Sequence, residues 1–159
     1  MSRREVERAR ETCLRLLGYR ARSRGELHDR LRRKGFAEDV VAATLEELER
    51  AGLVDDQGFA RAWVQERLAG NPRGSRGLRW ELRAKGVAEE LIQQAIAEEL
   101  GGERELEAAL RAAARYAVRP DEDESSYLRR LSGALKRRGF AFDVIAAALA
   151  CLREGQGSS

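Results

Sequence analysis

Proline and aromatic residues are scarce in this sequence. Of its 159 residues, 2 are proline and 6% are Phe, Trp or Tyr, whereas alanine, leucine, glutamate and arginine are abundant. Proline interrupts helices, and the aromatic and β-branched side chains that this chain uses sparingly are the ones that strands prefer. Since the abundant residues are good helix formers, the composition predicts an all-α protein.

Residues that bind metals or form disulfides are also few. The sequence has 2 cysteines, Cys13 and Cys151, near opposite ends of the chain, and 1 histidine, His28. Each cysteine falls on the apolar stripe of an expected helix and is predicted to be a small buried side chain. A metal site needs a cluster of ligands, and His28 has no cysteine nearby. We therefore expect no metal and no cofactor, with His28 half-exposed on a helix.

Phosphate-binding and catalytic motifs are missing as well. No P-loop and no dinucleotide fingerprint occurs, and the pair Asp55–Asp56 is more typical of a helix cap than of a catalytic pair. No apolar run is long enough for a membrane span, and the charged start Met1–Glu5 lacks the apolar core of a signal peptide. We therefore expect a non-enzymatic, reduced, cytoplasmic protein with no membrane partner.

Three segments of the sequence repeat one another without gaps. They are 26–36, 77–87 and 130–140, and each contains two leucines separated by three residues, then basic residues and a glycine. An apolar stripe with helical spacing follows each glycine at matching offsets. A repeat of this length and spacing is typical of tandem helical units.

Each repeat is predicted to contain three helices. The first helices are expected near residues 4–18, 55–69 and 103–118, the second near 24–34, 76–85 and 126–138, and the third near 37–51, 88–100 and 141–153. The repeats then occupy residues 1–54, 55–102 and 103–154, followed by a flexible tail at 155–159. A three-helix unit of this size buries its apolar faces poorly alone, so stacking of neighbouring units predicts an elongated, curved rod.

Capping residues and glycines mark the helix boundaries. Ser23 with Glu26 forms a capping-box pattern, and Asp55 or Asp56 can cap the fourth helix. The acidic segment 121–126 precedes the eighth helix, where negative charge favours the positive end of the helix. Left-handed residues are expected where helices end, at Gly35, Gly52, Gly70, Gly86 and Gly139.

Charge is distributed unevenly, although the net charge is only +3. The second helix of each repeat is rich in Arg and Lys, whereas the third helices of the first two repeats are rich in Asp and Glu. Nearly all the positive charge is arginine, which forms planar, bidentate contacts with phosphate or carboxylate groups. A row of arginines that recurs in every repeat is what a phosphate backbone or an acidic partner would bind.

The candidate contact residues lie on the outward face of the second helices. Leu78 and Leu82 should face the core, which places Trp80 on the opposite side of the helix. Trp80 would then stack on a base or anchor a protein interface, unless it packs against a neighbouring unit. Trp63, with Phe59 one turn earlier, is expected in the core. The predicted partner-binding or DNA-binding residues are Arg22, Arg33, Arg76, Trp80, Arg83, Arg129, Arg130, Lys136 and Arg137.

Three blocks of sequence resemble the RecX family of regulatory proteins. The first block runs from Leu17 to Phe36 and includes Ser23, Glu26, Leu27, Leu31, Lys34 and Gly35. The second runs from Gly52 to Trp63 with paired aspartates and a Phe-Ala step, and the third from Gly70 to Val87. The order and spacing of the blocks together, more than any one of them, carry the likeness, which extends over nearly the whole chain.

The resemblance implies tandem three-helix repeats in a curved, elongated monomer that binds in the groove of the RecA–DNA filament. It also implies inhibition or modulation of recombinase ATPase, strand exchange and filament extension, in homologous recombination, DNA repair and the SOS response. Weak electrostatic binding of single- and double-stranded DNA is part of the same expectation. Two alternatives stay open. One is a direct DNA-binding regulator, since three-helix units can resemble helix-turn-helix modules, and the other is a helical scaffold without a nucleic-acid role.

Overall fold

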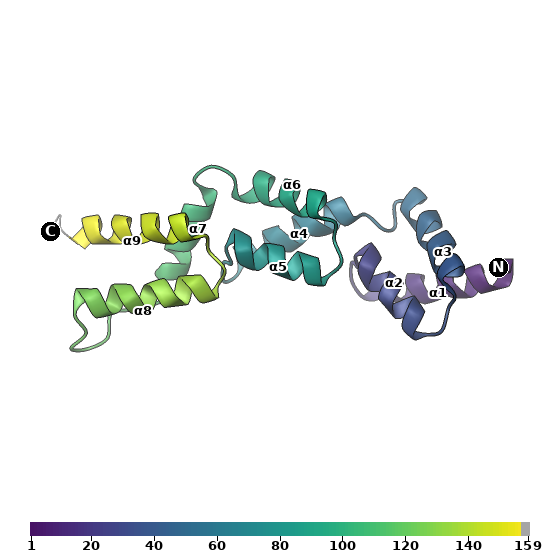
Figure 1. Ribbon diagram of the computed structural model, residues 1–159, viewed down its shortest axis with the longest axis horizontal. Coiled ribbons are helices and arrows are strands. Elements are labelled where there is room, and N and C mark those ends of the chain that lie inside the picture. The colour runs from purple at the N-terminus through teal and green to yellow at the C-terminus, as the bar shows by residue number, and fades with distance from the viewer. Residues whose placement is uncertain (157–159) are drawn as a thin grey trace. The chain divides into compact units, whose positions relative to one another are not determined.

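The computed structural model describes residues 1–156, which form nine helices joined by turns and loops (Figure 1). The helices are α1 (Arg3–Tyr19), α2 (Arg24–Arg33), α3 (Glu38–Arg50), α4 (Asp56–Ala69), α5 (Ser75–Ala84), α6 (Glu89–Leu100), α7 (Arg104–Ala113), α8 (Glu124–Arg137) and α9 (Phe142–Gln156). No strand occurs in this range. The predicted all-α class, with tandem three-helix repeats, is confirmed.

The largest departure from the expected helix boundaries is at α7, which ends at Ala113 rather than near residue 118. Beyond this helix, the carbonyls of Tyr116 and Ala117 accept hydrogen bonds from the Tyr127 hydroxyl and the Arg130 guanidinium, each at 2.7 Å. Side chains of α8 therefore satisfy two backbone acceptors in the segment that was expected to continue the helix.

The segment before α8 and the end of the chain also differ from expectation. The acidic segment 121–126 is partly helical, because α8 begins at Glu124 and the Asp123 carboxylate caps it by accepting from the Ser126 amide at 2.7 Å. Residues 155 and 156 of the predicted tail belong to α9. The remaining tail residues, 157–159, lie outside the described residues.

The chain forms two compact units. One comprises residues 1–62 and 82–92, and the other comprises residues 63–81 and the chain from residue 93 onward. Helices α4, α5 and α6 each contribute residues to both units. The middle repeat therefore has no compact unit of its own.

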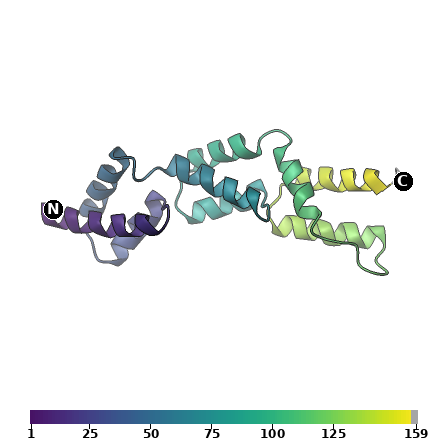
Figure 2. The same cartoon turned by 180° about the vertical axis from the view of Figure 1, so that it is seen from behind.

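The core of the first unit lies among α1, α2 and α3. Helix α3 packs on α1 and on α2 (Figure 2). The buried side chains there are Ala9, Cys13, Leu27, Leu31, Val40, Val41, Leu45, Leu48 and Val54. Ser2 with Glu5 and Ser23 with Glu26 form capping boxes at the starts of α1 and α2, so the capping box predicted at Ser23 is confirmed.

The core of the second unit lies among α7, α8 and α9. Figures 1 and 2 show α8 and α9 side by side, with α7 crossing both. Four small residues of α7 are buried in this core: Ala108, Ala109, Ala112 and Ala113. Because alanine has a short side chain, α7 can approach the buried Leu131, Leu135 and Ala148 of its neighbours closely.

The two cysteines differ in exposure. Cys13 is buried in α1, as predicted, and burial raises the pKa of its thiol to about 11. Cys151 is exposed on α9, so the prediction of a buried Cys151 is wrong. The buried stripe of α9 is formed by Ile145 and Ala148, and Cys151 lies beside this stripe rather than on it.

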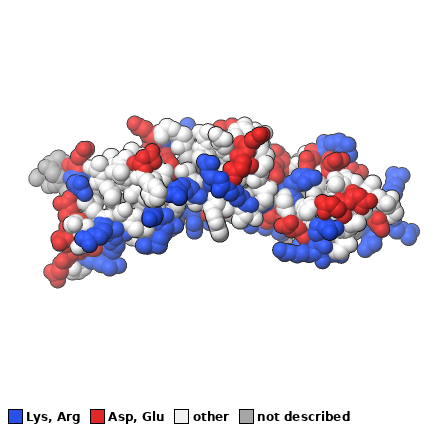
Figure 3. Space-filling model, in the orientation of Figure 1, with Lys and Arg blue, Asp and Glu red and all other residues white. Residues whose placement is uncertain are grey.

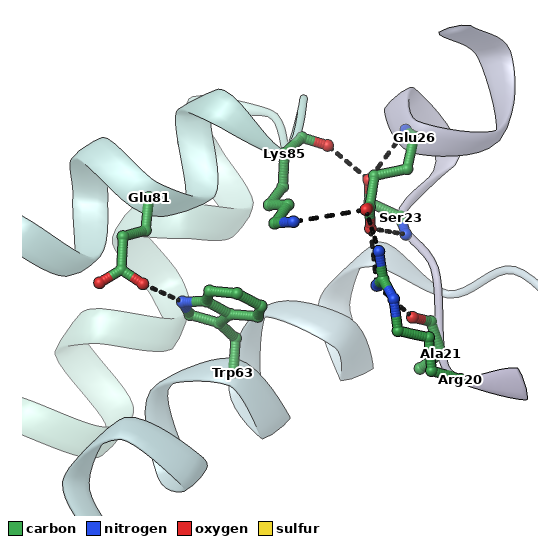
Figure 4. Close-up of polar contacts among 7 residues, drawn as sticks. All are labelled: Arg20, Ala21, Ser23, Glu26, Trp63, Glu81 and Lys85. Atoms are coloured by element: carbon green, nitrogen blue, oxygen red, sulfur yellow. Dashed lines mark hydrogen bonds and ion pairs between the residues drawn. The ribbon is translucent and has the colours of Figure 1, made fainter. Parts of the chain in front are cut away.

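Within the first unit, the start of α2 meets the turn that follows α5. The Ser23 hydroxyl donates a hydrogen bond to the Lys85 carbonyl, and the Lys85 ammonium lies 3.5 Å from the Glu26 carboxylate (Figure 4). A Cβ atom on Gly25 would lie only 2.9 Å from the Cα of Gly86. The two helix ends therefore touch backbone to backbone, which leaves no room for a side chain at Gly25.

The second unit contains a similar contact between the start of α5 and the turn that follows α8. The Gly74 amide donates to the Arg138 carbonyl at 3.0 Å, and the Arg76 amide donates to the Gly139 carbonyl at 2.9 Å. Gly139 has a φ of +80°, a left-handed conformation that favours glycine. A Cβ atom on Gly74 would lie 2.3 Å from the Cα of Phe140. Backbone groups again form this contact.

The predicted left-handed glycines are mostly confirmed. Positive φ angles occur at Gly35, Gly52, Gly86 and Gly139. Gly70 has no positive φ, and Gly102, which was not predicted, has one. At the end of α4 the guanidinium groups of Arg111 and Arg115 donate to the carbonyls of Leu68 and Gly70, so a left-handed cap is not needed there.

The paired aspartates at the start of α4 have separate roles. The Asp55 carboxylate accepts a hydrogen bond from the Gly58 amide at 3.2 Å and caps the helix. The Asp56 carboxylate accepts from the Arg24 amide at 2.8 Å, and burial raises the pKa of Asp56. Asp55 is therefore the cap of α4, and Asp56 joins α4 to the start of α2.

Candidate nucleic-acid and partner interface

Three of the predicted contact residues belong to the first unit. Arg22 precedes α2 and is half-buried, whereas Arg33, in the last turn of α2, is exposed. Arg83 is exposed and forms an ion pair with Glu89. Because an exposed pair of this kind is weak, Arg83 can exchange its partner for another anion. In Figure 3, Asp and Glu side chains gather over α3, as the charge pattern predicted.

Trp80 projects outward from α5, as predicted. Leu78 and Leu82 on the same helix are fully buried, whereas Trp80 is 72% exposed. A large aromatic side chain with this exposure is suited to stacking on a base or to anchoring a protein interface. The role of Trp80 stays a prediction.

Helix α8 presents a row of basic side chains. Arg129, Lys136 and Arg137 are all exposed, and Figure 3 shows Lys and Arg side chains gathered over this helix. Lys136 and Arg137 follow Arg129 by seven and eight residues, which is about two helical turns, so the three side chains lie on one side of the helix. These three predicted contact residues are therefore positioned together.

Arg130 differs from its neighbours, because it is bound inside the unit. Its Nε and Nη2 atoms donate to the two Glu122 carboxylate oxygens at 3.0 and 2.9 Å, and Nη2 also donates to the Ala117 carbonyl. These hydrogen bonds from Arg130 lower the pKa of Glu122 to about 2. The prediction that Arg130 faces outward is wrong, because it connects α8 to the preceding loop.

Phe142, which sequence reasoning missed, lies beside two of the predicted basic residues. It begins α9 and is 60% exposed. The Arg76 guanidinium lies 4.7 Å and the Lys136 ammonium 5.5 Å from the centre of its ring. Contacts of this kind attract a cation to the face of an aromatic ring. The exposed ring of Phe142 therefore lies next to one cation from α5 and one from α8.

We call this group the α8 surface and define it by the residues Arg76, Arg129, Lys136, Arg137 and Phe142. Around Arg76, Lys136, Phe142 and two glycines there is a pocket of about 300 Å³. Within residues 1–156, no carboxylate lies at ion-pair distance from any of these four cations. The α8 surface therefore combines cations that form no close ion pair with an exposed ring, although the charge of Arg129 acts on the nearby Asp123 carboxylate.

The buried carboxylate of Glu81 binds basic side chains of the second unit that do not belong to the α8 surface. Its Oε2 atom accepts hydrogen bonds from Trp63 Nε1 (Figure 4) and Arg67 Nε, each at 2.9 Å. The Nε atom of Arg73 lies 3.1 Å from Glu81 Oε1. Trp63 is half-buried, so it lies at the edge of the core rather than inside it as predicted, whereas Phe59 is buried.

Replacing Glu81 with alanine is expected to lower the free energy of unfolding by roughly 2–4 kcal/mol. The change leaves Arg67, Arg73 and the Trp63 indole without their shared acceptor. Glu81→Gln keeps one acceptor oxygen and should lose about half as much. Denaturant unfolding measures both losses. Equal stability of Glu81→Ala and the unaltered protein would contradict the importance of this carboxylate.

The described part of the chain has the features of neither a metal site nor a membrane span. No group of three or more His, Cys, Asp or Glu side chains there is arranged to hold a metal ion. No helix there is both long enough and apolar enough to cross a membrane.

Comparisons with known proteins identify the family. The model of the first three-helix domain of RecX matches residues 9–48, and that of the second matches residues 55–96. Regulatory protein RecX of Mycolicibacterium vanbaalenii is 44% identical, with 93% of this chain and 86% of that protein covered. The corresponding protein of Mycobacterium avium is 42% identical, with 93% and 88% covered.

A solved structure has the same fold. The crystal structure of RecX from Lactobacillus salivarius superposes with a TM-score of 0.84 at 21% identity, covering 94% of this chain and 97% of that one. Sequence and structure therefore agree, and the chain belongs to the RecX family of regulatory proteins.

Proposed function

We propose that this RecX-family protein binds in the groove of the RecA–DNA filament and inhibits recombinase ATPase, strand exchange and filament extension. It catalyses no reaction itself and works in the cytoplasm as a monomer. The family resemblance supports RecA as the partner. The observation that carries the DNA contact is the α8 surface, where Arg76 and Lys136 lie against the exposed ring of Phe142 and Arg129 and Arg137 are exposed on the same helix as Lys136.

Each part of the α8 surface matches a component of DNA. Arginine and lysine side chains neutralise phosphates and release counterions, which supplies most of the affinity for a nucleic-acid strand. An exposed aromatic ring adds stacking on a base without sequence preference. Phe142 provides such a ring next to Arg76 and Lys136. The surface is therefore suited to a DNA strand of any sequence.

Inhibition follows if the bound protein also contacts the recombinase. A molecule seated in the groove and touching neighbouring RecA subunits would restrain the subunit rearrangements that ATP turnover and filament extension require. Two other predicted contacts, Arg83 and Trp80, are exposed and are assigned to this role. Trp80 in particular has the size and exposure of an interface anchor.

The test is single-stranded-DNA-dependent ATP hydrolysis by the RecA of the same organism, titrated with this protein at fixed salt. Half-maximal inhibition is expected well below one molecule per recombinase monomer, because one bound molecule restrains several subunits. Inhibition only at concentrations that cover the free DNA would indicate competition for DNA instead.

The two alternatives give different results in the same experiment. No effect on ATP hydrolysis, with DNA binding present in a parallel mobility-shift assay, would favour a direct DNA-binding regulator. Neither inhibition nor DNA binding would favour a helical scaffold. Salt dependence of the DNA affinity separates these two cases, since only the first predicts it.

A further inference from the structure

A second basic site lies in the first unit, where the end of α1 meets the start of α2. The chain forms an open pocket of about 210 Å³ there, with Leu16 and Leu27 among its lining residues. Four arginines also line it: Arg20, Arg22, Arg30 and Arg33. The α8 surface is made of other residues, so this pocket is a separate site.

One of the four arginines is already neutralised within the unit. Arg20 donates two hydrogen bonds to the Glu26 carboxylate, at 2.7 and 3.3 Å, and a third to the Ala21 carbonyl (Figure 4). Glu26 also faces the Lys85 ammonium at 3.5 Å. Glu26 is therefore fully occupied and cannot neutralise the other three arginines of the pocket.

Arg22 is the unusual member of the group. Its Nε atom is buried and has no hydrogen-bond partner among residues 1–156. An unpaired buried donor costs free energy, and the cost is larger when the group is charged. Arg30 and Arg33 have no ion-pair partner in the described range either, and Asp29 is the one remaining carboxylate that lines the pocket. The pocket thus has an excess of positive charge.

We infer that this pocket binds a phosphate group of a nucleic-acid strand, with Arg22 as its central ligand. A phosphate offers several acceptor oxygens in a tetrahedral arrangement, so guanidinium groups can donate to it from different directions. A carboxylate has only two oxygens in one plane and would satisfy fewer of the three arginines. The pocket volume also suffices for a phosphate with bound water. The inference extends the DNA contact of the proposed function.

The first test is the salt dependence of oligothymidine binding, measured by fluorescence anisotropy without recombinase. Arg22→Gln should reduce the slope of log affinity against log salt by about 0.7, which corresponds to about tenfold weaker binding near 50 mM salt. Arg15→Gln is the matched control, because Arg15 is exposed on α1, has no ion-pair partner in the described part of the chain and does not line the pocket. Its slope should change less. An equal slope for Arg22→Gln and the unaltered protein would overturn the inference.

The second test uses the unaltered protein alone. The Arg22 Nε–H resonance, assigned by through-bond correlation to the Arg22 side chain, should shift when the protein is titrated with inorganic phosphate and with oligothymidine. A resonance that moves with polyglutamate but with neither phosphate probe would assign the pocket to an acidic protein partner and overturn the inference. An unaltered protein without oligothymidine affinity would overturn it too. Since RecA is absent, failure to inhibit the recombinase has no bearing on either result.

Discussion

Replacing Gly74 with alanine should destabilise the second unit by about 3 kcal/mol or more. The new Cβ would lie 2.3 Å from the Phe140 Cα and 2.6 Å from the Gly139 carbonyl oxygen. Both atoms belong to the backbone, so no side-chain rotation can relieve the clash and the start of α5 must move away. That movement would break the hydrogen bonds of Gly74 and Arg76 to the turn after α8. Denaturant unfolding followed by circular dichroism measures the loss.

Gly18→Ala is the matched control for this substitution. Gly18 lies in α1, has nothing near its missing Cβ and has no left-handed φ. Alanine there should leave stability unchanged or raise it by up to about 1 kcal/mol, because alanine favours helix and restricts the unfolded chain. If Gly74→Ala were as stable as Gly18→Ala, the close backbone contact would not exist in solution.

Reversing the charges of Arg129, Lys136 and Arg137 to glutamate should weaken oligothymidine binding about 100-fold or more near 0.1 M salt. Loss of three phosphate contacts accounts for a factor of this size, and repulsion by the new carboxylates adds to it. Inhibition of RecA ATP hydrolysis should decline in parallel. Arg130 is left unchanged, because its ion pair with Glu122 stabilises the unit. Fluorescence anisotropy measures the affinity, and circular dichroism checks that helicity is retained.

A variant with the same change in net charge controls for nonspecific electrostatics. Arg3, Arg4 and Arg15 are exposed on α1 and belong to neither the α8 surface nor the Arg22 pocket. Their reversal to glutamate should weaken binding far less. Equal losses in the two triple variants would show that overall charge, and not the α8 surface, determines the affinity for DNA.

Features that depend on neighbouring residues in the sequence were predictable. Ser23 and Glu26 are three residues apart, so their capping box follows from local backbone geometry. The exposure of Trp80 follows from helical periodicity once Leu78 and Leu82 are assigned to the core. The all-α class and the three-helix repeats follow from the same periodicity applied to the whole chain.

Features that depend on contacts between helices and loops could not be predicted. The spacing of Arg130 on α8 resembles that of its exposed neighbours, but the partner that binds it, Glu122, comes from the loop before the helix. The sequence shows that residue 74 is a glycine, but its contact with Phe140 exists only once the start of α5 packs on the turn after α8. The sequence did contain one signal for Phe142. This second phenylalanine follows Phe140, which belongs to the repeat, but it lies outside the apolar stripe of the next helix and so would be exposed.

Because only one of the two thiols is exposed, a chemical label would attach to the protein at a single position. A maleimide dye would react with Cys151, because the other thiol is buried and resists ionisation. Cys151 follows Phe142 by nine residues of the same helix, which is two and a half turns, so the label would lie on the side of α9 opposite the phenylalanine. A dye there would stay clear of the proposed DNA contact at Phe142. The unaltered sequence can therefore carry a single label for anisotropy measurements of DNA binding without blocking that contact.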